Sequence, residues 1–397
     1  MHFPQFQTVN RRKFLQLSGL FTASMGLSTA TASCAHRESA SGLPVRTGYL
    51  PITDAAALLA AYDRGFYKAE GLDAEAPKKF RSWDAIAQAF MARKVNVVHL
   101  LMPITVWLRY GQNFPGKVVA WNHTNGSAVT VLPEINKAED LAGRDIAIPS
   151  GYSIHNMVLQ MLLRQHGLEA VIKPKDQPLK ANEVRLVVLP PPDMLSALQE
   201  GAIAGYIVAE PYNSAAELTQ SGKLLRLTGD IWKDHACCVV FMHEDDLTQR
   251  PDWTQAIVNA IVKAQQWAKV NRPELAYILS KDGGQYMPYD LPVLERVMTY
   301  YDNDYYYRKG AIINPSWRSR RIDFQPYPFP SYTTELVQAL QQTLIGGDVD
   351  FLQTLDPEQV AQDLVDDSFV KKSLAHVGGP QAFGLSLDLA RQESILL

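Results

Sequence analysis

The segment that decides the fold is residues 189–213, which reads L-P-P-P-D-M-L-S-A-L-Q-E-G-A-I-A-G-Y-I-V-A-E-P-Y-N. It follows an apolar, β-branched run at 184–188, which predicts a strand buried on both faces. Three prolines end that strand, and residues 194–199 have the apolar spacing of a helix that Gly201 closes. Residues 204–208 predict the next strand, so the segment is one unit of an open α/β sheet.

Glu210 directly follows the second of these strands and precedes Pro211. Ligands of open α/β sheets bind beyond the carboxyl ends of the strands, which makes Glu210 a candidate binding residue. Acidic side chains also favour helix N-termini, so Glu210 could instead cap a helix that starts at Pro211. The segment alone leaves both interpretations open.

The rest of the chain continues the alternation of strands and helices, which predicts parallel sheets with crossovers. We expect strands at 45–50, 72–76, 95–101, 117–121, 129–132, 145–148, 224–228 and 236–242. We expect helices at 55–64, 83–92, 153–166, 253–270, 273–279, 291–301, 332–343 and 357–373. This order predicts two α/β lobes: lobe I at 44–135 and 236–397, including a helical tail, and an inserted lobe II at 140–230. The chain would cross between the lobes near 133–143 and 229–235.

Residues 1–33 have the pattern of an export signal rather than of a folded element. Arg11-Arg12 is a twin-arginine pattern, a short and weakly apolar run follows it, and Ala30-Thr31-Ala32 is a cleavage site. Cys34 comes next, so a lipid on Cys34 is the alternative to a free thiol. We expect a mature protein in the periplasm or on the outer face of the cytoplasmic membrane.

Composition narrows the class of partner. The formal charge is −3 and becomes −6 without residues 1–33, which hold three cations and no acid. A mildly acidic chain without a basic block disfavours nucleic acid and anionic lipid surfaces as partners. Only Cys237 and Cys238 remain after Cys34, too few for a disulfide scaffold.

The turn Pro149-Ser150-Gly151-Tyr152-Ser153-Ile154-His155 joins a predicted strand to a helix N-terminus. Free backbone N–H groups and the helix dipole make such a turn an anion site, and His155 can donate a hydrogen bond there. The alternative is a capped helix with a solvated histidine. Trp83 and Trp121, near ends of predicted strands, are either pocket walls or core residues.

His235, Cys237, Cys238 and His243 look like a metal-binding tract. Adjacent cysteines cannot both bind one ion unless the chain bends, and the apolar run 236–241 favours a buried strand in which free cysteine acts as a small hydrophobe. The sequence contains none of the catalytic or phosphate-binding patterns G-x-S-x-G, H-E-x-x-H and G-x-x-x-x-G-K-S/T, and no G-x-G-x-x-G after a strand. The sequence therefore favours binding over catalysis.

The chain resembles the nitrate- and bicarbonate-binding proteins of ABC importers, within the taurine/nitrate-type group of solute-binding proteins. The motifs run in family order from about residue 44 to 240. They are Gly48-Tyr49-Leu50-Pro51-Ile52-Thr53-Asp54, Ser82-Trp83, residues 99–103, Asn125-Gly126-Ser127, Pro190-Pro191-Pro192-Asp193-Met194, Ala209-Glu210-Pro211-Tyr212-Asn213 and residues 228–235.

The resemblance implies a type II periplasmic-binding-protein fold, a ligand in a cleft between two lobes, a helical C-terminal extension and an ABC permease as partner. The residues expected at the ligand are Thr53, Asp54, Trp83, His99, Ser127, Gly151, Tyr152, Ser153, His155 and Glu210. Oxyanion binders of the family have Gln where this chain has the shorter Ser127. We therefore expect a small polar or anionic solute of the nitrate/bicarbonate-like class, and not nitrate or bicarbonate in particular. In the bicarbonate branch, a calcium ion accompanies the acid at the Glu210 position.

Two other classes share this fold or its pattern. Pyrimidine-precursor synthases of thiamine biosynthesis have cysteine and histidine positions that Cys237-Cys238 resembles, but they are cytoplasmic enzymes, whereas Arg11-Arg12 predicts export. A ligand-sensing module is the third class. We expect no enzyme and no obligatory cofactor.

Overall fold

The computed structural model describes residues 43–314, 317 and 320–396. The predicted signal at 1–33, its twin arginines and Cys34 lie outside the described residues. Within those residues, no helix combines the length and apolar composition needed to cross a membrane.

The first sheet has the strand order β2-β1-β3-β12-β4. The bounds are β1 (Thr47–Tyr49), β2 (Lys78–Lys79), β3 (Val97–Leu101), β4 (Gly116–Trp121) and β12 (Cys238–His243). The strand β1 is parallel to β2 and β3, whereas β12 runs antiparallel to β3 and β4. The carboxyl ends of β1 and β3 therefore lie at the same edge of the sheet as the first residue of β12.

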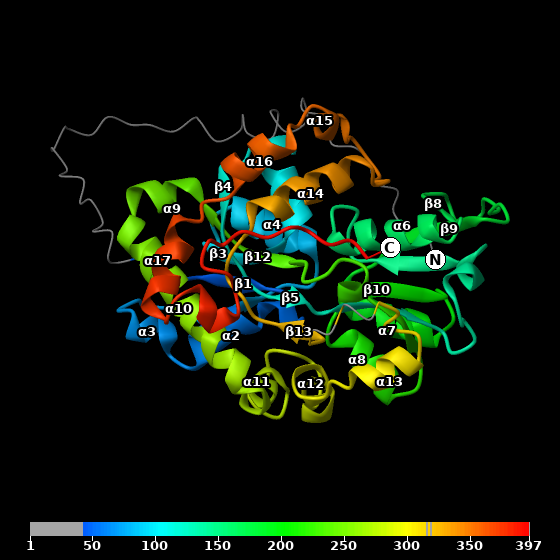
Figure 1. Ribbon diagram of the computed structural model, residues 1–397, viewed down its shortest axis with the longest axis horizontal. Coiled ribbons are helices and arrows are strands. Elements are labelled where there is room, and N and C mark those ends of the chain that lie inside the picture. Colours follow the sequence, from blue (N-terminus) through cyan, green and yellow to red (C-terminus); the bar gives the residue numbers. More distant parts are fainter. Residues whose placement is uncertain (1–42, 315–316, 318–319, 397) are drawn as a thin grey trace, which may run out of the picture. The chain divides into compact units, whose positions relative to one another are not determined.

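The second sheet has the order β11-β6-β10-β7-β9-β8. The bounds are β6 (Ser127–Val131), β7 (Asp145–Ile148), β8 (Glu169–Val171), β9 (Glu183–Val188), β10 (Gly205–Ala209) and β11 (Lys223–Leu227). The strands β10, β7, β9 and β8 are parallel, and β6 is antiparallel to both of its neighbours. Figure 1 shows β8, β9 and β10 apart from β1, β3 and β12. The predicted α/β class is confirmed.

Helices cover both sheets and form most of the C-terminal part (Figure 1). They are α2 (Ala56–Asp63), α3 (Phe66–Ala69), α4 (Trp83–Met91), α5 (Met102–Val106), α6 (Ile154–Gln165), α7 (Pro191–Gln199), α8 (Tyr212–Leu218), α9 (Glu244–Gln249), α10 (Pro251–Val270), α11 (Arg272–Leu279), α12 (Leu291–Met298), α13 (Asn303–Arg308), α14 (Pro330–Gln341), α15 (Asp350–Gln353), α16 (Pro357–Leu364) and α17 (Ser368–His376). The helix α10 packs on α2, α3 and α17, whereas α6, α7 and α8 contact the second sheet.

Several expected boundaries need correction. Residues 72–76 are not a strand, because there only Ala74 forms a bridge, to Val45. The prolines after β9 start α7 rather than only ending the strand, since proline fits the first helical turn, which needs no N–H donor. The expected helix at 357–373 is two helices, α16 and α17.

The first crossover between the sheets lies at 122–126, not at 133–143. The reason is that β6, expected in lobe I, pairs with β10 and β11 of the second sheet. The second crossover joins β11 to β12 and contains the expected 229–235. A short antiparallel pair, β5 (Thr124–Asn125) and β13 (Ile322–Asp323), ties the first crossover to the C-terminal part.

One continuous apolar core serves both sheets, and the described residues belong to one compact unit. The division into two lobes therefore stays a prediction, apart from β6, which the structure places in the second sheet. Trp121 is fully buried in this core, with its ring centroid 4.8 Å from that of Tyr332 and 5.6 Å from that of Phe329. It is a packing residue.

Candidate ligand-binding centre between the sheets

Polar side chains from both sheets meet in a buried centre. From the first sheet come Asp54, in the turn η1 (Thr53–Ala55) after β1, and Cys237, just before β12. From the second sheet come Ser127, the first residue of β6, and His155, in the first turn of α6. Each is at most 2% exposed. The fold therefore brings together residues that the sequence separates by up to about 180 positions.

His155 connects the two sheets in this centre. Its Nε2 lies 2.9 Å from the Oγ of Ser127 and 3.8 Å from the Sγ of Cys237. Its Nδ1 has no hydrogen-bond partner among the described residues. His155 and Ser127, both expected among the ligand-binding residues, are thus neighbours in the structure, and their contact with a ligand stays a prediction.

Asp54 forms a buried ion pair with His123, a residue of the first crossover. The Oδ2 of Asp54 lies 3.0 Å from the Nε2 of His123, and both side chains are fully buried. Burial alone would raise the pKa of Asp54, but the charge of His123 outweighs it and lowers that pKa. Burial would likewise lower the pKa of His123, yet Asp54 raises it to about 10.

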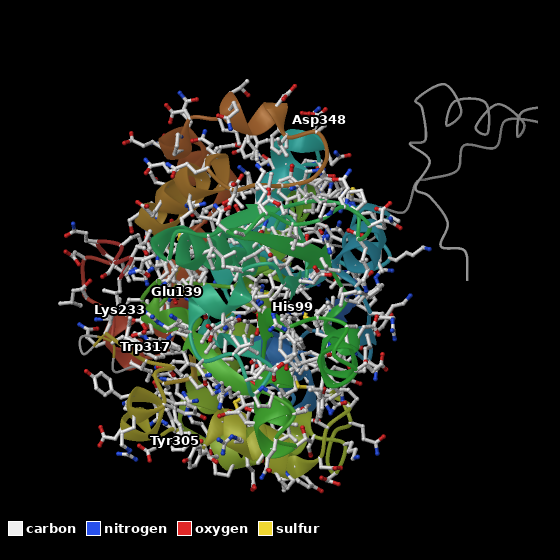
Figure 2. All side chains as sticks on the ribbon, turned by 90° about the vertical axis from the view of Figure 1, so that its right-hand side faces the viewer. His99, Glu139, Lys233, Tyr305, Trp317 and Asp348 are labelled. Carbon is white, nitrogen blue, oxygen red and sulfur yellow. The ribbon has the colours of Figure 1, made fainter. Side chains whose placement is uncertain are left out.

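His99, on β3, presents an unpaired donor beside Trp83. Burial lowers the pKa of His99 to about 3, so the ring is neutral. Its Nε2 accepts the N–H of Leu50 over 2.8 Å, which leaves the hydrogen on Nδ1. That Nδ1 and the Nε1 of Trp83 have no partner among the described residues, and the two rings lie 5.5 Å apart. Figure 2 shows His99 among the packed interior side chains.

The four residues that look like a metal-binding tract in the sequence lie in different parts of the structure. Cys237 and Cys238 join the buried centre, with their Sγ atoms 4.0 Å apart. The chain bends at Cys237, which is the condition under which two adjacent cysteines can bind one ion. His235 instead contacts the carbonyl of Trp232 over 2.9 Å, and His243 caps α9.

The thiols of the two cysteines differ in acidity. Burial raises the pKa of a thiol, but Cys238 and the charge of His155 outweigh burial at Cys237 and lower its pKa. Burial and the neighbouring Cys237 both raise the pKa of Cys238. Cys237 is therefore the sulfur that deprotonates first.

Glu210 has two partners, one of them a cation that sequence reasoning missed. Its Oε1 accepts the Nε–H of Arg321 over 2.5 Å, and its Oε2 accepts the N–H of Ser214 over 3.0 Å. The second bond satisfies a backbone N–H in the first turn of α8, although Glu210 lies one residue before the N-cap position, Pro211. Contact of Glu210 with a ligand stays a prediction. The carbonyl of Glu210 also accepts the N–H of Thr53 over 2.8 Å, which joins the two sheets.

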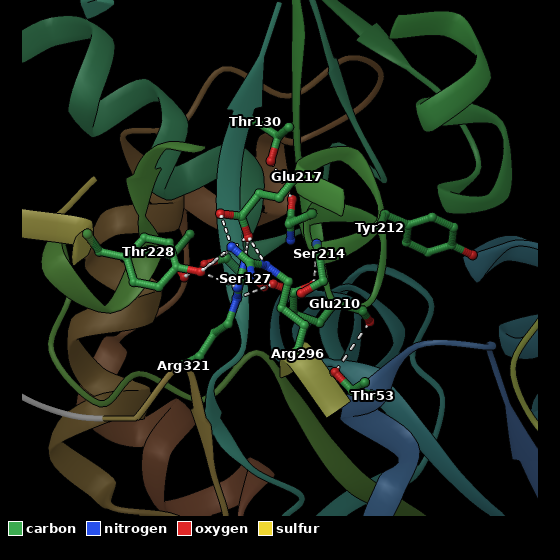
Figure 3. A network of polar contacts seen from close by, with 12 residues as sticks. Thr53, Ser127, Thr130, Glu210, Tyr212, Ser214, Glu217, Thr228, Arg296 and Arg321 are labelled. Atoms are coloured by element: carbon green, nitrogen blue, oxygen red, sulfur yellow. Dashed lines mark hydrogen bonds and ion pairs between the residues drawn. The ribbon is translucent and has the colours of Figure 1, made fainter. Parts of the chain in front are cut away.

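Arg321 is fully buried and also contacts Glu217 over 2.8 Å (Figure 3). It donates a further hydrogen bond to the hydroxyl of Tyr306 over 2.8 Å. Burial would lower the pKa of Arg321, but Glu210 and Glu217 outweigh it and raise that pKa. Both carboxylate oxygens of Glu210 accept a hydrogen bond, and Arg321 supplies a counter-charge that a calcium ion would otherwise provide. A calcium ion at this position stays a prediction.

The residues of the turn before α6 have different roles in the structure. Ser153 caps the helix, accepting the N–H of Asn156 over 3.0 Å, so its hydroxyl serves the backbone. Tyr152 is half-buried beside Trp107 and Phe351, at ring distances of 6.0 and 6.3 Å, away from His155's partners. Gly151 packs near Ile345. Of this turn, the structure places only the His155 side chain in the centre.

His123 and Arg321 were not predicted from the sequence as residues of this centre. His123 lies in the turn-forming stretch between two expected strands, and nothing in its spacing ties it to Asp54. Arg321 lies on a segment without a recognisable period, and it reaches Glu210 only because β13 pairs with β5. The one available signal for Arg321 was that Glu210, if buried, would need a positively charged partner.

Two α/β sheets linked by two crossovers around a buried polar centre define the class of periplasmic solute-binding folds. The chain belongs to the NMT1-like family, whose model matches residues 40–280. It is 28% identical, over 68% of its length and 70% of the relative, to the nitrate/nitrite binding protein NrtA of a Nostoc species. It is 27% identical to the bicarbonate-binding protein CmpA of Synechococcus elongatus, over 73% of each chain.

Among solved structures, the periplasmic nitrate-binding protein NrtA of Synechocystis superposes with a TM-score of 0.71. The match covers 89% of this chain and 94% of that chain at 19% sequence identity. The periplasmic-binding-protein fold expected from the sequence is confirmed.

Proposed function

We propose that this chain is the exported solute-binding component of an ABC importer and that it captures a small polar or anionic solute in the buried centre. One observation carries the proposal: the Nδ1–H of His99 and the Nε1–H of Trp83 are buried neighbours without a protein acceptor. A buried unpaired donor costs about 1–3 kcal/mol. A solute with acceptor oxygens would relieve that cost at both donors.

The charges around the centre suit such a solute. A bare Glu210 would repel an anion, but Arg321 neutralises it. His155 and the hydroxyl of Ser127 add groups that can donate a hydrogen bond. Asp54 carries a negative charge that His123 compensates. Hydrogen-bond donors therefore determine which solutes the centre can bind, because the charged side chains around it form balanced ion pairs and leave no excess of positive charge.

The named relatives support the transport role. NrtA and CmpA are binding proteins by name, and we propose that this chain likewise delivers its solute to an ABC permease. The two crossovers, at 122–126 and 228–237, would act as the hinge about which the sheets close on the solute. We also propose export by the twin-arginine pattern at Arg11-Arg12, with a lipid on Cys34 as the alternative to a free thiol.

One observation favours an enzyme as the second candidate. Cys237 has a lowered thiol pKa and lies 3.8 Å from His155, an arrangement that nucleophilic cysteines use. Its complete burial and the binding-protein names of the relatives favour a non-catalytic role. Turnover of a bound solute by the purified protein would support the enzyme instead.

The test is a thermal-shift screen of the mature protein against nitrate, nitrite, bicarbonate, cyanate, alkanesulfonates and thiamine-pyrimidine precursors. We expect one of these classes to raise Tm, because a ligand that binds only the folded state stabilises it by mass action. The Trp83→Phe variant, which lacks the donor but keeps the ring, should show a smaller shift. A shift equal in both proteins would contradict the proposed site.

A further inference from the structure

Four potential metal ligands converge at one point of the buried centre. The side chains are Asp54, His123, Cys237 and Cys238, each fully buried. Each offers one ligand atom, and these four atoms all lie within 4.8 Å of one another. They come from three separate segments: η1, the first crossover and the bend before β12. This convergence is a product of the fold and not of local sequence.

The spacing fits the edges of a small coordination tetrahedron. With Zn–S bonds of about 2.3 Å and Zn–N or Zn–O bonds of about 2.0–2.1 Å, tetrahedral angles place two sulfurs about 3.8 Å apart and a nitrogen and an oxygen about 3.3 Å apart. The two Sγ atoms are 4.0 Å apart, and Asp54 Oδ2 is 3.0 Å from His123 Nε2. These two edges match the tetrahedral values to within a few tenths of an ångström. The other pairs lie within 4.8 Å and would shorten by up to about 1.2 Å to reach sulfur–nitrogen and sulfur–oxygen edges of about 3.6 Å.

Burial gives a second, independent reason for a ligand here. Of the two carboxylate oxygens of Asp54, Oδ1 has no partner among the described residues and Oδ2 has only the Nε2 of His123. The charge of His123 balances that of Asp54, so a bound metal ion would displace the proton of His123 and replace it as the counter-charge of the carboxylate. A divalent ion would balance the carboxylate and a deprotonated Cys237 together.

We propose that Asp54, His123, Cys237 and Cys238 form a tetrahedral site for a thiophilic divalent transition-metal ion of the Zn²⁺ class. Two thiolates, one imidazole and one carboxylate select against Ca²⁺ and Mg²⁺, which take oxygen ligands. Four protein ligands leave no open position, so the ion is held by the protein alone. The site goes beyond the proposed solute function and does not depend on it.

The test uses Co²⁺ added to the reduced, metal-free mature protein. Wild type should bind one Co²⁺ per chain and show intense visible d–d bands of a tetrahedral ion with a thiolate-to-cobalt charge-transfer band. Cys237→Ser, Cys238→Ser and His123→Gln should each weaken Co²⁺ binding at least tenfold. The His243→Asn variant keeps a good N-cap at the far end of β12 and is the matched control. Zn²⁺ should displace the cobalt.

The absence of a charge-transfer band in folded wild type would overturn the proposal, and so would unchanged bands in both cysteine variants. The wild-type spectrum decides even if a variant fails to fold, which circular dichroism would reveal. The solute screen is repeated after chelation of metal. Solute binding without the cobalt bands would refute only the metal site, whereas cobalt bands without any solute binding would refute only the transport proposal.

Discussion

Arg321 donates its Nε–H to the Oε1 of Glu210 over 2.5 Å, and both side chains are fully buried. The bond joins the carboxyl end of β10 to a segment more than a hundred residues further along the chain. Glu217 is a second carboxylate on the same guanidinium. The arginine therefore holds two acids, and the C-terminal part is bound to the second sheet through it.

Removing this cation should be costly, because a buried charge that loses its partner is uncompensated. We expect Arg321→Met to lower the free energy of unfolding by about 3–5 kcal/mol. Urea denaturation measures the change, with Arg320→Met, an exposed neighbour, as the control. In the same assay Glu210→Gln should destabilise the solute-free protein. A loss below about 1 kcal/mol in Arg321→Met would show that the pair is not a structural anchor.

His155 should affect binding more than stability. Its ring is expected to contact the solute through Nδ1, so His155→Ala should weaken binding by about 1.5–3 kcal/mol, the range for a hydrogen bond to a charged group. Isothermal titration against the solute found in the screen measures this. His166→Ala, at the exposed C-terminal end of the same helix, should leave the affinity unchanged. Equal affinities in wild type and His155→Ala would remove His155 from the site.

Gly229 lies where the two crossovers approach each other. A Cβ there would lie 2.5 Å from the Oδ1 of Asn125 and 2.5 Å from the ring of Trp317. We expect Gly229→Ala to destabilise the fold by about 1–3 kcal/mol through overpacking. Gly346→Ala is the control, because its Cβ would make an ordinary 3.5 Å contact with Ile172. If both variants melt at the same temperature as wild type, the close approach is not a constraint.

Asp363, on α16, should contribute stability that depends on pH. Hydrogen bonds from Arg109, at 2.5 and 2.6 Å, outweigh burial and hold the pKa of Asp363 well below its ordinary value of 3.8. Because the folded-state pKa is depressed, this contribution is fully present above pH 3.8 and is lost as the pH falls below it. The difference in urea midpoint between wild type and Asp363→Asn should therefore be constant from pH 7 to 5 and shrink in more acidic buffer. A constant difference at low pH would contradict this pairing.

The periodic parts of the chain could be predicted from the sequence. Alternating apolar runs and helical spacings indicated β7, β9, β10 and α10 nearly as they are, because their burial leaves a pattern in the sequence. The strand β2 could not be found this way, since both its residues are exposed lysines. The first crossover was misplaced because β6 is equally apolar whichever sheet it joins.

The candidate centre was predicted only in part. The structure brings Asp54, Ser127 and His155 to the centre. Trp83, at the start of α4, and His99, within β3, lie against each other, a contact that the sequence did not predict. His123 could not be assigned to Asp54, because their contact depends on tertiary packing and not on spacing. Tyr152 and Ser153 were placed at the ligand by the turn pattern, yet one packs on aromatic rings and the other caps α6.

The most direct test of the account is a crystal structure of the mature protein with the solute that binds most tightly in the screen. We predict electron density for the solute in the buried centre, with an oxygen within hydrogen-bond distance of the Nδ1 of His99 or the Nε1 of Trp83. His155 or Ser127 should contact the same molecule from the second sheet. Density for the solute elsewhere, with these donors still unpaired, would contradict the central claim.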